Sequence, residues 1–61
     1  MSKRLEIDAK KEREASSGLA CLYDVGLDEN YWIPNSLCED IGNNKLEVDV
    51  WWLDLNIPEL L

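Results

Sequence analysis

Alternating apolar and polar residues mark the clearest strand of this chain. In residues 45–50 (KLEVDV), leucine and two valines occupy every second position, which predicts a half-buried strand. Its two acids, Glu47 and Asp49, are then directed outward on one face, about 6.8 Å apart. Residues 18–25 (GLACLYDV) form a nearly continuous apolar run of strand length, which predicts a second, more fully buried strand.

Shorter elements are predicted between turn residues. Residues 31–33 (YWI) indicate a short aromatic strand that ends at Pro34, because proline cannot donate a hydrogen bond to a central ladder. Residues 37–40 (LCED) resemble a single helical turn, with a side-chain oxygen before it as a cap and acids near its N-terminus. The three glycines stand alone between elements and are typical of turns.

Two segments have no single interpretation. Residues 2–15 form either a helix, with opposite charges four residues apart, or a strand in which apolar residues alternate from Leu5 to Ala9. Residues 51–56 (WWLDLN) either extend the preceding strand or form a helical turn or two. Pro58 keeps the residue before it extended in both cases.

Length and composition predict one small domain, residues 1–61. A chain of 61 residues hides roughly 60% of its unfolded surface on folding, so its stability is marginal or is helped by a partner. With 46% hydrophobic and 31% charged residues, the chain is still apolar enough to fold. We expect a mainly β (α+β) fold, a small antiparallel sheet or partly open barrel of about four strands with a short helical turn.

The N-terminal residues favour a cytoplasmic protein. No apolar stretch of signal-peptide length follows the N-terminal charges, and no apolar run, residues 50–53 included, is long enough to span a bilayer. Two free thiols are therefore favoured over a disulfide for Cys21 and Cys38, although a bridge stays open. They do not form a CxxC pair, and the chain has no histidine, so we expect no metal and no cofactor.

Charge is distributed unevenly along the chain. The formal net charge is −7, yet residues 1–15 contain five cations and four acids. Residues 16–61 contain nine acids and one cation, Lys45. This distribution disfavours direct binding of nucleic acid, because the domain offers no basic groove.

The inventory of side chains argues against an enzyme. Without histidine there is no Ser-His or Cys-His nucleophile in its common form, and no glycine-rich phosphate loop is present. The carboxylate pairs Asp28–Glu29 and Glu39–Asp40 are formally suited to acid–base work, but so small a domain has little volume for a pocket. Residues 24–30 lack the alternating oxygen ligands of an EF-hand.

Adjacent aromatic residues suggest apolar anchors. Neighbouring side chains of a strand point to opposite faces, so Trp51 and Trp52 cannot both be buried if their segment is extended. Exposed tryptophans are enriched in protein interfaces. We therefore predict a partner-binding surface made of acids with tryptophan anchors: Asp28, Glu29, Glu39, Asp40, Glu47, Asp49, Trp32 and Trp52.

The order LEIDAK, LACLYDV, YWIPNS and KLEVDVWW resembles a group of small phage-type proteins. These proteins carry a Trp-Ile-Pro-Lys-Ser motif followed by a Val-x-x-Trp-Leu ending, and the resemblance implies a compact β-barrel-like fold. It favours a strand at the N-terminus. The chain departs from the pattern at Asn35, where lysine is usual, and at residues 56–58 (NIP), which interrupt a continuing helix.

These features together predict a stoichiometric inhibitor. A rigid row of carboxylates imitates the regularly spaced charge of duplex DNA, and a protein built this way docks on basic DNA-binding grooves. Acidity, small size and the phage-type resemblance suggest an anti-CRISPR or another anti-defence inhibitor, a monomer or weak homodimer without membrane contact. The alternatives are a phage or bacterial adaptor for a replication or recombination protein, and an oligomerising module held by tryptophans.

Overall fold

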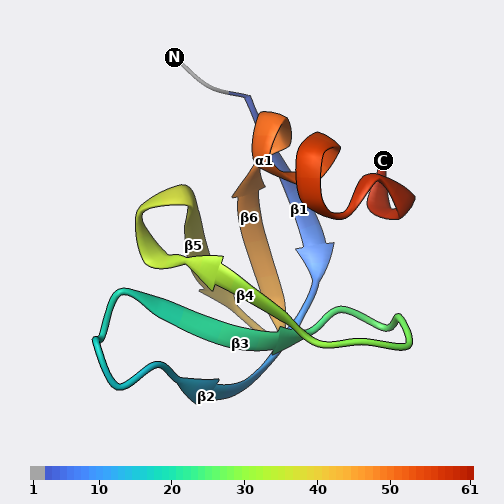
Figure 1. Cartoon of the computed structure of the whole chain (residues 1–61). Coiled ribbons are helices and arrows are strands. Elements are labelled where there is room, and N and C mark those ends of the chain that lie inside the picture. The colour runs from blue at the N-terminus through green and yellow to red at the C-terminus, as the bar shows by residue number, and fades with distance from the viewer. Residues whose placement is uncertain (1–2) are drawn as a thin grey trace.

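The computed structural model describes residues 3–61 and contains two three-stranded antiparallel sheets (Figure 1). Sheet A has the strand order β1-β6-β5, and sheet B has the order β2-β3-β4. The mainly β prediction is confirmed, with six strands in place of about four; in residues 3–61 no ladder joins the sheets into a closed barrel. The elements are β1 (Arg4–Asp8), β2 (Lys10–Glu14), β3 (Ala20–Asp24), β4 (Tyr31–Pro34), β5 (Cys38–Gly42), β6 (Lys45–Asp49), α1 (Val50–Asn56) and the 3-10 turns η1 (Asn35–Leu37) and η2 (Pro58–Leu60).

The N-terminal segment is extended, as the strand interpretation predicts. It forms β1 in sheet A and β2 in sheet B, and Ala9 lies between them. The amide of Ala9 donates a hydrogen bond to the carbonyl oxygen of Asn44 at 2.9 Å. Ile7 and Ala9 are buried whereas every residue of β2 is exposed, so the chain changes sheets where its apolar alternation ends.

The helical turn predicted at residues 37–40 was wrong. The turn lies earlier, at η1, and Cys38 already begins strand β5. A hairpin decides this outcome: Asn43 and Asn44 have φ angles of 55° and 58°, the left-handed pair that a two-residue type I′ connection requires. Pairing with β6 through that connection holds β5 extended despite its acids.

The tryptophan segment is helical. Helix α1 begins at Val50, which the alternation had placed at the end of the strand, and ends at Asn56. The amide of Ile57 still donates to the carbonyl oxygen of Leu53 at 2.7 Å before Pro58 begins η2. Of the two interpretations of residues 51–56, the helical one is therefore confirmed, and the helix ends before Ile57 and Pro58.

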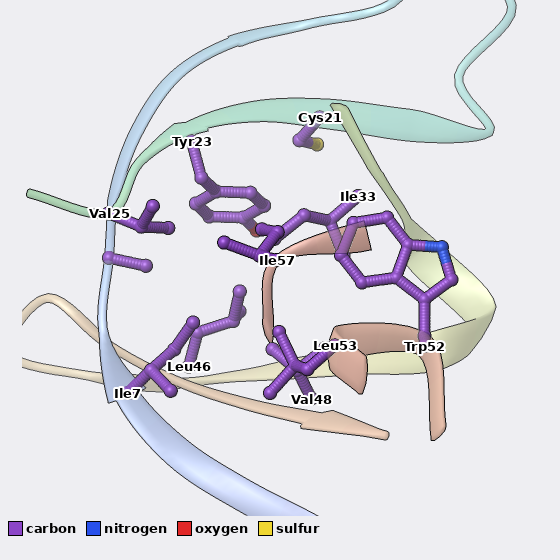
Figure 2. Close-up of a cluster of buried hydrophobic side chains, with 11 residues drawn as sticks. Ile7, Cys21, Tyr23, Val25, Ile33, Leu46, Val48, Trp52, Leu53 and Ile57 are labelled. Carbon is purple, nitrogen blue, oxygen red and sulfur yellow. The ribbon is translucent and has the colours of Figure 1, made fainter. Parts of the chain in front are cut away.

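The core lies between the two sheets and is completed by the C-terminal segment (Figure 2). Cys21 and Tyr23 enter from β3, and Ile7, Leu46 and Val48 enter from sheet A on the opposite side. The side chains that are most completely buried are Ile33, Leu46, Leu53, Ile57 and Val48. Each sheet thus has one inner face in the core and one outer face.

The Asn43-Asn44 turn gives a test of the fold. Asn44→Ala is expected to lower the free energy of unfolding by about 1 kcal/mol, because alanine tolerates the left-handed region less well than asparagine. Asn44→Gly is the matched control and should keep or raise stability. Urea denaturation of the three proteins measures the effect, and equal stability of the alanine and glycine variants would contradict the turn.

Two core groups predict a loss of stability at alkaline pH. Burial raises the pKa of the Tyr23 phenol from its ordinary 10.0 and the pKa of the Cys38 thiol from 9.0. The unfolded chain therefore ionises first, so this stabilisation is complete below pH 9.0 and is lost as pH rises through the higher folded values. The midpoint of urea denaturation, measured at several pH values above 9.0, should fall less steeply with pH for Tyr23→Phe and for Cys38→Ser than for the natural chain.

Candidate functional site

Three glutamates stand side by side on the outer face of sheet A. Glu47 of the central strand β6 lies directly opposite Glu6 of β1 and directly opposite Glu39 of β5. Directly opposite residues of an antiparallel pair share a face, with Cβ atoms about 4.5–5.5 Å apart. Glu6 and Glu39 are exposed and Glu47 is half-buried. We call these three residues the carboxylate row.

Two cations, Arg4 and Lys45, flank the carboxylate row. On one side, Arg4 Nε donates to Asp49 Oδ1 at 2.8 Å, and Arg4 Nη1 lies 3.9 Å from Glu39 Oε1. On the other side, Lys45 Nζ donates to the carboxylate of Asp8. The hydrogen bond to Asp49, followed by the charges of Asp49, Glu39 and Glu47, raises the pKa of Arg4. The hydrogen bond to Asp8, followed by the charges of Asp8 and Glu6, raises the pKa of Lys45. Five acids and two cations leave this face with a formal charge of −3.

The predicted role of Asp49 as an outward binding residue was wrong. Asp49 shares a face with Glu47, as the alternation requires, but it is only 6% exposed. Its neighbour across the ladder is Arg4, whose guanidinium neutralises it. The alternation of a strand predicts the face on which a side chain lies. It does not predict which residue of the neighbouring strand lies beside that side chain, and here the neighbour, Arg4, comes from the other end of the chain.

Asp28 and Glu29 belong to a separate acidic group. They lie exposed in the loop between β3 and β4 and line a surface hollow together with Tyr31 and Glu59. Desolvation, followed by the charges of Glu59, Glu29 and Asp28, raises the pKa of the Tyr31 phenol. This group surrounds the start of β4, which belongs to sheet B. The carboxylate row lies on strands of sheet A, so the two acidic groups are on different sheets.

Asp40 is also outside the carboxylate row. It follows Glu39 on β5 and therefore points to the opposite side of the strand. Its Oδ1 accepts a hydrogen bond from the amide of Gly42 at 2.8 Å, and it lines a pocket with Cys21 and Cys38. The adjacent acids Glu39 and Asp40 thus serve two different surfaces.

The two tryptophan predictions have different outcomes. Trp52 is 9% exposed and packs in the core, so its role as an exposed anchor was wrong; the helical turn directs Trp51 outward instead, at 49% exposed. Trp32 is 42% exposed. It lies opposite Leu22 on the outer face of sheet B, and the Arg13 guanidinium lies 5.5 Å from its ring centroid. This is a cation–π contact, on the other sheet from the carboxylate row.

Of the predicted residues, the fold brings Glu39 and Glu47 together on one face and adds Glu6, which the sequence analysis did not select. The sequence feature that could have identified Glu6 is the alternation of residues 5–9, in which Glu6 occupies a polar position. That alternation predicts an outward side chain but does not reveal which strand lies beside it. The pairing of β1 with β6 supplies the missing contact.

Within residues 3–61, no three His, Cys, Asp or Glu side chains are grouped in a way that could hold a metal ion. No helix in that range is long and apolar enough to cross a membrane. Comparison with protein-family models, curated proteins and solved structures gives no match. Chemically, the outer face of sheet A attracts positive charge.

Two charge reversals on β6 test this description of the face. Glu47→Lys replaces two like-charge neighbours by two opposite-charge neighbours and should raise the free energy of unfolding by about 0.5–1 kcal/mol. Asp49→Lys places a buried ammonium beside Arg4 and should lower it by about 3 kcal/mol or more. Urea denaturation at one pH compares them. Equal tolerance of both substitutions would mean that the Arg4–Asp49 pair does not form.

Proposed function

We propose that this protein acts without chemistry, by docking the carboxylate row on the basic groove with which another protein binds nucleic acid. The observation that carries the proposal is the direct alignment of Glu6, Glu47 and Glu39 across three neighbouring strands. Arg4 reaches only one end of the row, at Glu39, and its shorter contact is with Asp49. The row therefore retains negative charge for a partner.

The cost of the row to the folded domain supports a binding role. Like charges directly opposite one another destabilise a sheet, and Glu47 has such a neighbour on each side. A neutral polar side chain at this position would solvate equally well without the repulsion. In a chain of 61 residues, where folding stability is small, a row that its neighbouring cations neutralise only in part is best explained by a partner that supplies more positive charge.

The density of charge along the row supports mimicry of nucleic acid. Neighbouring strands lie about 4.7–4.9 Å apart, and each strand of duplex DNA carries one charge per about 3.4 Å of axis. A sheet holds its side chains at this spacing more rigidly than a loop does. The row therefore presents a short segment of dense negative charge to a groove that evolved for phosphates, and steering by that charge speeds association.

The partner that we propose is a nucleic-acid-targeting defence complex of a bacterial cell, which would make the protein an anti-CRISPR-like inhibitor acting in the host cytoplasm. The net charge of −7 and the resemblance of the YWIPNS segment to small phage-type proteins support this choice. An adaptor that binds a replication or recombination enzyme would use the same face. The identity of the captured partner separates these two roles.

A second candidate function is self-association through exposed apolar side chains. Trp32 and Trp51 are 42% and 49% exposed, and Leu19 and Leu55 are 73% and 74% exposed. An oligomer held by these groups would be detected by light scattering of the purified protein without any partner, and raising the salt concentration would not dissociate it.

Capture from a bacterial lysate at low and high salt, followed by mass spectrometry, tests the main proposal. The natural chain should retain a nucleic-acid-binding protein that high salt or added duplex DNA releases. The double variant Glu6→Gln with Glu47→Gln should retain about tenfold less of it, while its circular dichroism spectrum stays unchanged and its urea midpoint rises.

The matched control is Asp28→Asn with Glu29→Gln. It removes the same formal charge from the loop between β3 and β4, so it separates the effect of the row from that of net charge. Equal loss of the partner in both double variants would show that overall charge matters and the row does not. Capture that persists at high salt would contradict docking through carboxylates.

A further inference from the structure

Two free thiols line one pocket at the corner where the chain passes from sheet B to sheet A. Cys21 lies on β3, and Cys38 is the first residue of β5. The Sγ atom of Cys21 lies 3.4 Å from Asn35 Oδ1, and that of Cys38 lies 3.5 Å from the carbonyl oxygen of Pro34. The two thiols thus contact consecutive residues, and both line one surface pocket of about 230 Å³.

The two thiols differ in access. Cys21 is 4% exposed and faces the core (Figure 2), whereas Cys38 is half-buried and reaches the pocket surface. Burial and then the neighbouring Cys21 raise the pKa of Cys38, so the two groups interact electrically. Lys11 lines the same pocket, and its pKa is raised by its hydrogen bond to Glu14 and then by Cys21.

We propose that Cys21 and Cys38 are an oxidisable pair that closes into an intramolecular disulfide between sheet B and sheet A. The oxidant is a low-molecular-weight disulfide. Cys38, the accessible thiol, loses its proton and attacks one sulfur, which forms a mixed disulfide and releases the first small thiol. Cys21 then loses its proton and attacks the sulfur of Cys38, which releases the second small thiol. The protein loses two hydrogens and the oxidant gains them.

The bridge would break no strong interaction of either thiol. Only weak S–H···O contacts to Asn35 and Pro34 have to break, and no ion pair of sheet A is involved. The closed loop joins strands from different sheets, so it restricts the unfolded chain and stabilises the fold. The carboxylate row lies on the outer face of sheet A, whereas both cysteines belong to the core cluster or pack against it, so oxidation leaves the row exposed.

Incubation of the folded, reduced protein with oxidised glutathione tests the pair. Intact-mass spectrometry should show a loss of about 2 Da without a retained glutathione. The thermal midpoint should rise by about 10 °C or more and return after reduction. Peptide mapping should place Cys21 and Cys38 in one cross-linked product.

Cys38→Ser is the control, since serine at this half-buried position preserves the shape of the side chain. It should show no 2 Da loss and no rise of the thermal midpoint, and its buried Cys21 should stay unmodified while the protein is folded. A natural chain that keeps glutathione, forms covalent dimers, or closes the bridge only in urea would overturn the proposal.

Discussion

Packing of one face of each sheet against the other is the constraint on which this structure depends. A chain of 61 residues supports one core, and both sheets must contribute to it. Ile33 of sheet B and Leu46 and Val48 of sheet A are almost fully buried there, with Leu53 and Ile57 beside them. Because strand side chains alternate, the same packing sends the intervening acids to the outer faces. The side of each sheet on which these acids lie is thus a consequence of how the core is filled.

Alternation and turn residues predicted the mainly β class and the strands β3, β4 and β6. The pattern of residues 45–50 identified β6, and the glycine and asparagines before it identified a turn. β5 was not predictable in the same way. Four of its five residues are exposed or polar, so it has no apolar period, and it is extended because β6 lies beside it. A strand that is stabilised mainly by pairing with its neighbour does not need an alternating pattern in its own sequence, so the sequence alone does not predict it.

The candidate site shows the same division between local and distant information. Glu39 and Glu47 were selected for their charge, but their alignment with Glu6 depends on the register of three strands. Asp49 was misjudged because its neutralising partner, Arg4, comes from the other end of the chain. Trp52 was misjudged because its segment is a helix, in which burial follows a different period from that of a strand.

The carboxylate row is assembled from β1, β5 and β6, so no contiguous peptide of this chain contains it. A partner that recognises all three carboxylates binds the native state and ignores the unfolded one. By mass action, such a partner holds the chain in its native state, and the lifetime of the protein against cellular proteases becomes linked to the supply of that partner. Excess copies would be degraded first, which matches the amount of the protein to the amount of its target.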